Sequence, residues 1–433
     1  MTRIRTTPPG QFNRPRAWPR GALALAVVLC SVTFSNIGLA AAAKDQDPRD
    51  AAIEDLLRRV DRLETELSAL KKTNPEPPPG VPPPPASPSR DEEQEARALR
   101  EETASSRRFP DLSIRGFGDV HYKFTDLPAQ HNAFSFGQLD FFLTSRLSEY
   151  LSVLGEMAFE SNNKNEPSFE VERLHIKYSF NDYFELALGR YHSSIGYYNT
   201  AYHHGTWFQT AMGRPHLFDF EDNGGFLPIH NVGLAANGLI SSGPLGLRYV
   251  VEIGNGRNYS PGEEPVQIAS DNNNYKSLNL ALIARPDLIP ALELGVSAYH
   301  DHLTTVGLPS IDQKIFSAHV VYKTQVFEWL NEGVWLRHSP SDTQQVFTTP
   351  AYYSQISRRF GRLRPYLRYQ YTHFAEGDPL FMLRGEQGIR RGPSLGLRFD
   401  FATYAAFKGQ YDRAYEAGSD PVNDLTFQID FTF

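Results

Sequence analysis

The sequence contains almost no cysteine. Cys30 is the only cysteine among 433 residues, and it lies in an apolar stretch near the amino terminus that we expect to be removed. Leu29, which precedes it, is too large for a lipoprotein cleavage site, so no acyl anchor is expected. A mature chain without cysteine has neither disulfide bonds nor thiolate chemistry.

Long apolar runs are missing as well. After position 45 the chain has no run of eighteen or more apolar residues, so no transmembrane helix is predicted there. The His-Glu-x-x-His motif of zinc metalloproteases is absent. The pattern Gly254-Asn255-Gly256 ends a predicted strand and is not followed by a helix. We therefore do not expect an enzyme, and no cofactor or resident metal is expected.

Residues 1–42 are predicted to be a signal peptide. Basic residues occur between Arg3 and Arg20, an apolar stretch runs from Gly21 to about Leu39, and small residues follow at Ala40–Ala43. An uncleaved anchor helix is the alternative. Removing this segment, which holds five arginines and no acid, takes the formal net charge from −7 to −12. Such an acidic chain is not expected to bind nucleic acid.

Residues 50–72 are predicted to form a coiled-coil helix. Apolar residues recur at alternating spacings of three and four over about three heptads. Arg59 and Glu64 can pair between neighbouring helices, as in short trimeric coiled coils, and a solvated amphipathic helix is the alternative. The predicted trimerisation residues are Ile53, Leu56, Arg59, Val60, Leu63, Glu64, Leu67 and Leu70.

A linker is predicted over residues 73–110. Nine of the seventeen residues from Asn74 to Arg90 are prolines, which excludes helix and sheet and favours an extended polyproline spacer. A charged stretch without an apolar face follows. The globular part is expected to span residues 111–433.

Within that part, apolar and polar residues alternate with period two, which indicates an all-β fold. The predicted strands are residues 112–124, 134–147, 150–160, 168–180, 183–192, 229–241, 245–256, 276–286, 290–302, 312–323, 325–338, 348–360, 363–375, 388–402, 404–415 and 423–433.

An even number of strands with alternating tight and long connections is typical of a bacterial outer-membrane β-barrel. The strand faces agree, since Leu174 and Ile176 oppose Arg173 on one strand. A charged side chain facing mid-bilayer lipid costs roughly 2–4 kcal/mol, so the polar face should line the lumen. A soluble β-sandwich would also alternate, but it would need no export signal. The sequence therefore predicts a transmembrane antiparallel barrel of about sixteen strands in the outer membrane, with the coiled coil in the periplasm.

The last predicted strand has a strictly apolar face. Its outward residues include the predicted barrel-closing residues Phe427, Ile429, Phe431 and Phe433. A strand that closes a barrel against the first strand needs a lipid-facing side of this kind. We expect it to be recognised by the barrel-assembly machinery.

The longest connection, residues 193–228, falls after the fifth predicted strand and is the third external loop. A loop this long is expected to be functional. We predict that it folds into the barrel and narrows the pore, where rings of side chains set selectivity. Its candidate constriction residues are His203, His204, Trp207, Arg214, His216, Asp219, Glu221 and Asp222. A metal site built from its histidines and acids is the alternative, although the spacing matches no metal motif.

Several arginines alternate with apolar residues along their strands and are therefore assigned to the lumen. We predict that they form a row of basic groups, the basic ladder, along the pore wall. Their guanidinium groups would favour anions, unless each pairs with a neighbouring acid. These residues are Arg173, Arg248, Arg285, Arg364, Arg368 and Arg398.

Signal peptide, short coiled coil, spacer and terminal Phe strand together resemble the porin superfamily that includes the phosphate-selective porins O and P. The strand Glu172–Tyr178 and the segments Leu188–Tyr191 and Ile195–Tyr197 carry this likeness. The resemblance implies a trimeric porin for passive diffusion of small hydrophilic solutes or ions. Phosphate selectivity implies basic residues on the third loop, which holds one arginine and no lysine.

We therefore expect an outer-membrane porin whose partners are lipid, two further copies of itself and the assembly machinery. Two alternatives stay open. The barrel could chiefly anchor the coiled coil to the cell wall, with peptidoglycan as partner, or the loop could form a metal-dependent enzyme site.

Overall fold

The computed structural model describes residues 109–128, 130–161, 167–202, 205–219, 225–257, 273–304 and 309–433. The predicted signal peptide and coiled coil, with nearly all of the linker, lie outside the described residues. Those assignments stay predictions.

The described part of the chain contains sixteen strands, and the predicted all-β fold is confirmed. The strands are β1 Asp111–Thr125, β2 Ala133–Arg146, β3 Leu151–Ser161, β4 Pro167–Asn181, β5 Phe184–His192, β6 His230–Leu239, β7 Leu247–Asn255, β8 Lys276–Ala284, β9 Leu292–Leu303, β10 Ile311–Lys323, β11 Phe327–Pro340, β12 Phe347–Arg358, β13 Leu363–Phe374, β14 Gly388–Phe399, β15 Ala405–Glu416 and β16 Val422–Thr432.

Helical structure in the described residues is confined to short segments in connections. These are α4 Tyr198–Ala201, η1 Thr206–Phe208, η2 His216–Phe218, η3 Gly243–Leu245 and α5 Pro379–Leu383. Within the described residues, no helix is long and apolar enough to cross a membrane.

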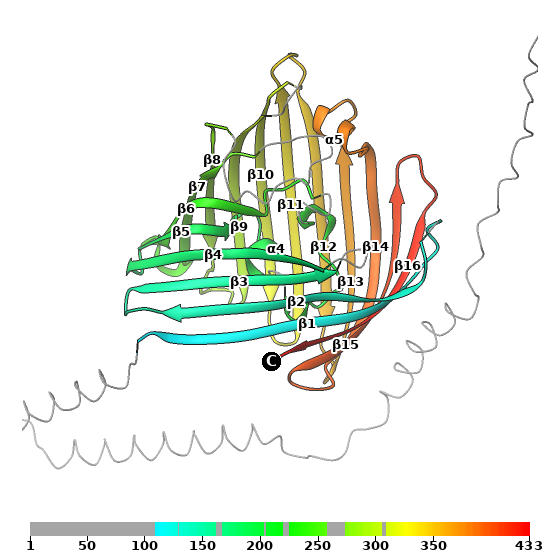
Figure 1. Cartoon of the computed structure of the whole chain (residues 1–433), viewed down its shortest axis with the longest axis horizontal. Helices are drawn as coiled ribbons and strands as arrows, with labels where there is room; N and C mark the ends of the chain where they lie inside the picture. The colour runs from blue at the N-terminus through cyan, green and yellow to red at the C-terminus, as the bar shows by residue number, and fades with distance from the viewer. Residues whose placement is uncertain are drawn as a thin grey trace, which may run out of the picture. The chain divides into compact units, whose positions relative to one another are not determined.

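The strands form one closed antiparallel barrel in which each strand pairs with its neighbours in sequence (Figure 1). Closure joins β1 to β16, with Phe117 opposite Thr432 and Val120 opposite Ile429. Phe433 extends this pairing, because its N–H and C=O both hydrogen bond to Gly116 at 3.0 and 2.8 Å. Its ring also covers Gly116, where an added Cβ would lie 2.1 Å from the ring. Glycine is thus required on β1 by the aromatic side chain on the adjoining strand.

Burial alternates along the strands, as the sequence pattern predicts. On β11, Glu328, Leu330 and Glu332 are buried, whereas Trp329 and Trp335 between and beyond them are exposed. The outer face is rich in large apolar groups, and Phe134 and Phe136 on β2 are 79% and 75% exposed. The exterior is therefore apolar, whereas the interior takes both polar and apolar side chains.

Besides an irregularity at the end of β4, between Ser179 and Asn181, two bulges break the period of two. One lies where β1 pairs with β2, between Gly118 and Val120, and the other lies where β3 pairs with β4, between Glu156 and Met157. A bulge inserts an extra residue and turns the following side chains to the other face. At the second bulge Glu172 becomes an interior residue that is only 2% exposed, although it has the parity of the outward-facing Leu174.

The longest connections all lie at one end of the barrel. Residues 147–150 and 182–183 are tight turns, whereas residues 193–229 and 256–275 are long loops after odd-numbered strands. The connection from β5 to β6 runs through the interior, and α4 lies within the ring of strands in Figure 1. This folded-in loop, defined as residues 193–229, organises the candidate site.

Candidate functional site in the barrel interior

The folded-in loop begins and ends at one anchored point. The Ser193 N–H donates to the Ile229 carbonyl at 2.9 Å, which holds the two roots together. Asn199 strengthens this closure, because its Nδ2 donates to the Ser193 carbonyl at 2.8 Å and to the Ile229 carbonyl at 3.1 Å. The Asn199 carbonyl in turn accepts from His192 Nδ1 at 3.0 Å. The loop therefore leaves and rejoins the wall as a closed unit.

Helix α4 is docked on β11 by a buried carboxylate. Glu332 accepts the Tyr197 N–H and the Tyr198 N–H, the latter at 2.9 Å, and also the Tyr353 hydroxyl. These N–H groups belong to the first turn of α4, which has no partners for them within the helix. The carboxylate thus satisfies donors that would otherwise be buried without acceptors.

A second carboxylate fixes the other end of α4. Glu328 accepts from the Tyr202 hydroxyl at 3.0 Å and from Gln355 Nε2 at 2.9 Å. Burial raises the pKa of Tyr202 well above its ordinary value, because the phenolate would lose its hydration. The hydroxyl therefore keeps its proton and acts as the donor. Lys323 Nζ completes the cluster with a bond to the same hydroxyl at 3.1 Å.

The middle of the loop, residues 206–213, is held by cations on the far strands. Lys408 Nζ donates to the Thr206 carbonyl at 2.7 Å, and Arg398 Nη1 donates to the Trp207 and Gln209 carbonyls at 2.7 and 2.9 Å. Arg368 donates to the Met212 and Gly213 carbonyls, both at 2.9 Å.

Strand β7 holds the loop on the opposite side, where Glu252 accepts from the Ser194 N–H at 3.0 Å. A segment bonded both to β7 and to β13–β15 of a closed barrel must cross its interior.

Apolar packing fills the space between the loop and the strands β9–β13. Tyr198 stacks on Phe218 with ring centroids 5.6 Å apart, and both rings meet Tyr353 edge-on. Phe226, near the loop's end, packs edge-on against Phe381 of α5. These residues belong to one buried cluster. One side of the interior is therefore a hydrophobic core and not an open passage.

Buried acids predominate on β1–β4 and buried cations on β13–β15, and further buried acids lie on β7, β9, β11 and β16. Strands β1–β4 contribute one buried acid each, and these are Asp119, Asp140, Glu156 and Glu172. Strands β13–β15 contribute cations at cross-strand positions, since Arg364 faces Arg398 and Arg398 faces Lys408. Acids lie beside these cations, since Arg398 Nε is 2.7 Å from Asp400 and Lys408 Nζ is 3.3 Å from Asp430, so any electric field across the interior is partly neutralised.

The six arginines of the predicted ladder do not lie together. Arg364, Arg368 and Arg398 are neighbours on β13 and β14, and the last two are bound to the loop. Arg173 pairs with Glu156 at 2.9 Å, Arg248 bonds Asn237 at 3.3 Å, and Arg285 pairs with Glu293 at 2.7 Å. Two of the six thus hold the loop, and others are neutralised by acids.

The predicted constriction residues are spread along the loop. Trp207 lies under Arg398, whose guanidinium carbon is 4.8 Å from the ring centroid. Arg214 Nη2 bonds the Asn199 side chain at 3.2 Å. His216 Nδ1 lies 3.2 Å from Asp219 Oδ2, a pair too small to hold a metal ion alone. His203, His204, Glu221 and Asp222 lie outside the described residues.

Besides Arg368 and Arg398, which the sequence placed in the lumen, five side chains that sequence reasoning missed anchor the loop. Glu252, Glu328, Glu332, Gln370 and Gln410 all lie at inward positions, and Gln370 and Gln410 accept the His216 and Met212 N–H groups at 3.0 and 2.9 Å. Strand parity marks these positions as interior. It carries no signal for their loop partners, which are more than fifty residues away.

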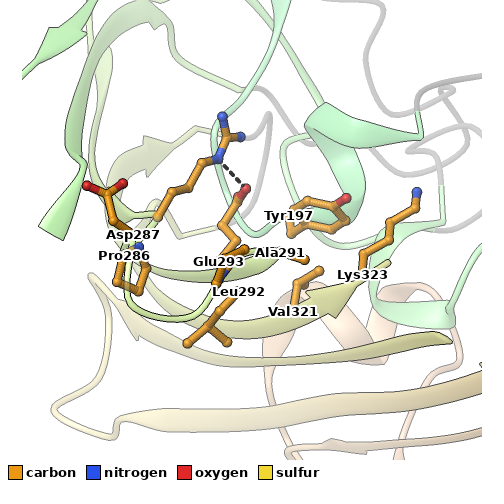
Figure 2. Close-up of a pocket in the computed structure, with 10 residues that line it drawn as sticks. Tyr197, Pro286, Asp287, Ala291, Leu292, Glu293, Val321 and Lys323 are labelled. Carbon is orange, nitrogen blue, oxygen red and sulfur yellow. Dashed lines mark hydrogen bonds and ion pairs between the residues drawn. The ribbon is translucent and has the colours of Figure 1, made fainter. Parts of the chain in front are cut away.

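A hollow of about 430 Å³ opens at the short-turn end, beside the first residues of the loop. It is lined by Tyr197, by the β8–β9 turn and by the ends of β9 and β10. Figure 2 shows Tyr197, Glu293 and Lys323 projecting toward this space. Charged and aromatic groups thus meet at one mouth of the interior.

One pattern in the sequence has the form of a nucleophile motif. Gly392-Pro393-Ser394-Leu395-Gly396 fits Gly-x-Ser-x-Gly. In hydrolases that serine sits on a sharp turn from strand to helix. Here Ser394 lies within β14, paired with Arg368 of β13, and is 1% exposed. The pattern therefore lacks the backbone geometry of a nucleophile.

The closed sixteen-stranded barrel with a loop inside defines the fold of the outer-membrane porins. No family model and no curated protein sequence matches the chain. The solved structures that align with it along most of their length include three outer-membrane proteins. An anion-selective porin from Comamonas acidovorans is 12% identical with a TM-score of 0.53, covering 75% of this chain and 99% of that protein.

The outer membrane channel DcaP of Acinetobacter baumannii is 11% identical with a TM-score of 0.51, covering 75% and 97%. OmpT of Vibrio cholerae, in its trimer form, is 11% identical with a TM-score of 0.52, covering 75% and 99%. At these identities the likeness concerns the fold alone.

Proposed function

We propose that this protein is an outer-membrane porin, a non-enzymatic channel for passive diffusion of small hydrophilic solutes or ions. The observation that carries the proposal is the folded-in loop, which is bonded to β7, β11 and β13–β15 inside a closed barrel. A barrel that served only as an anchor would not need a loop fixed at so many points across its interior. The loop would act as the constriction, with its backbone held in place by the wall.

The unequal distribution of buried charge favours a pore in which passing solutes are oriented by an electric field across the channel. Asp140 and Glu156 lie on one side, and Arg364 and Arg368 lie on the other. A solute passing between them would align its dipole with the transverse field. Because Arg368 and Arg398 are also bound to loop carbonyls, the same cations would set both the shape and the field of the passage.

Planar-bilayer recording tests the proposal. The purified protein is expected to give stable single-channel steps that scale with salt concentration. The measurement also separates the porin from the anchor hypothesis, because an anchor predicts a folded barrel without steps. A folded, inserted protein that gives no stable conductance would contradict the porin function.

We further propose a homotrimer, supported by the trimer form of the OmpT structure and by the heptad pattern of residues 50–72. In this arrangement the coiled coil lies in the periplasm and faces the cell wall. The barrel-assembly machinery recognises the terminal strand β16. Closed cyclic symmetry is the usual form of such oligomers.

Deleting residues 50–72 tests the role of the coiled coil. Trimers of the shortened protein are expected to dissociate at a lower temperature in detergent, because three helices no longer bury their apolar seams. Native electrophoresis after stepwise heating measures this. A deletion of similar length in the proline-rich spacer is the control, and an unchanged trimer after loss of residues 50–72 would reject the clamp.

A further inference from the structure

Three potential metal ligands meet where the folded-in loop joins the wall. They are Glu172 on β4, His192 at the end of β5 and His230 at the start of β6, and one ligand atom from each lies within 4.8 Å of the other two. His230 Nε2 is 2.7 Å from Glu172 Oε2, and the two imidazole centroids are 4.7 Å apart. All three residues are buried. None of them belongs to the loop cluster that the sequence suggested as a metal site.

The backbone holds these side chains on one face. His192 and His230 are directly paired across β5 and β6, so both rings project to the same side of the sheet. The bulge at Glu156 and Met157 turns Glu172 inward beside them. The cluster is therefore formed by strand register and does not depend on a flexible segment.

The tautomer of His192 suits a ligand. Its Nδ1 lies 3.0 Å from the Asn199 carbonyl oxygen, which can only accept. Nδ1 therefore carries the proton, and Nε2 carries the lone pair that binds a metal. A metal-ligating histidine is commonly held in this way by a backbone carbonyl on its other nitrogen. Here that carbonyl belongs to α4 of the loop.

Buried acids outnumber cations around the cluster, with Asp140, Glu156 and Glu172 set against two arginines. Asp140 and Glu156 lie on the adjoining strands β2 and β3 and are buried as well. Arg173 is engaged by Glu156 at 2.9 Å. Arg190 is directed to the Glu172 main chain, since its Nε donates to that carbonyl at 2.9 Å.

We propose that Glu172, His192 and His230 bind one divalent transition-metal ion of the zinc class. Two imidazole nitrogens and a carboxylate are a suitable set for zinc, with an open fourth position. Ligand atoms lie about 2.0–2.2 Å from zinc, so two ligands of one ion are at most about 4 Å apart. All three ligand atoms lie within 4.8 Å of one another, so small side-chain shifts are enough to bring them to one ion. His230 Nε2 and Glu172 Oε2, which are 2.7 Å apart, must separate slightly to admit it. Binding replaces the proton shared by His230 Nε2 and Glu172, and one proton is released.

The ion would join three strands at the roots of the loop. β5 and β6 carry the two roots, and β4 is tied to them by Glu172. Because His192 is also bonded to Asn199, metal binding would fix the position of α4 relative to the wall. The site is independent of whether the barrel conducts.

Zinc titration of the purified full-length protein, followed by isothermal calorimetry and metal analysis, tests the proposal. One zinc per chain is expected, with affinity unaffected by excess magnesium because magnesium prefers oxygen ligands. Glu172→Gln, His192→Gln and His230→Gln are each expected to weaken binding by about tenfold or more, since each removes a ligand. His216→Gln is the matched control and should leave the affinity unchanged.

X-ray absorption at the zinc edge of the wild-type protein decides the matter even where a variant does not fold. The expected shell is two imidazole nitrogens with carboxylate and water oxygens. A folded wild-type protein that binds no zinc would overturn the site and leave His230 and Glu172 as an ion pair. A shell without imidazole, or zinc binding lost only in His216→Gln, would also overturn it.

Discussion

Replacing Lys408 by methionine is expected to destabilise the barrel by about 3–5 kcal/mol, because it leaves a buried charge without its partner. Lys408 Nζ lies 3.3 Å from Asp430 Oδ2, and both side chains are fully shielded from solvent. The ammonium also donates to the Thr206 carbonyl at 2.7 Å. Its loss therefore leaves a carboxylate and a loop carbonyl unsatisfied in the interior.

Urea unfolding in detergent micelles or lipid vesicles measures this cost. The matched control is Lys123→Met, which breaks the ion pair with Asp424 at 2.8 Å. Those side chains are 42% and 21% exposed, so the control should cost less than about 1 kcal/mol. A double change of Lys408 to methionine and Asp430 to leucine should recover much of the stability, because both charges are gone. Equal costs for Lys408 and Lys123 would contradict the prediction.

Replacing Glu332 by alanine is expected to release α4 from the wall. Three buried donors lose their acceptor, namely the N–H groups of Tyr197 and Tyr198 and the hydroxyl of Tyr353. Each unsatisfied donor costs about 1–3 kcal/mol, so local opening of the loop should become easier by about 3 kcal/mol or more. This corresponds to a rise of about 100-fold or more in amide exchange at Tyr197 and Tyr198.

Hydrogen exchange of the two amides measures this release, and single-channel recording follows its consequence, which is a larger and noisier conductance. Thr200→Ala is the control within the same helix. Its hydroxyl donates to the Tyr197 carbonyl at 3.1 Å and is exposed, so its loss should change little. Unchanged exchange in Glu332→Ala would mean that apolar packing alone holds α4.

The strands were predictable because consecutive residues of a barrel strand face lipid and lumen in turn, so apolar and polar side chains alternate along the sequence. Every predicted segment corresponds to a strand of the structure, from 112–124 for β1 to 423–433 for β16. The apolar face of the last strand is likewise predictable from Phe427 and Ile429. No partner has to be known for this reasoning, since lipid and lumen impose the alternation residue by residue.

The folded-in loop could be recognised by its length but not by its contacts. Nothing in the local pattern around Glu332 indicates that it receives the amides of α4 from more than a hundred residues away. The predicted arginine ladder shows the same difficulty, because Arg368 and Arg398 are bound to loop carbonyls. The odd or even position of a residue in a strand predicts which face of the sheet its side chain occupies. It does not predict which residues that side chain contacts.

The sequence by itself determined the all-β architecture, because the period of two follows from local burial. Only the tertiary structure decided which interior groups meet. Barrel closure brings β7 and β13–β15 within reach of one loop, and a single bulge turns Glu172 toward His192 and His230. Both depend on register between strands, a long-range property that alternation along one strand does not encode.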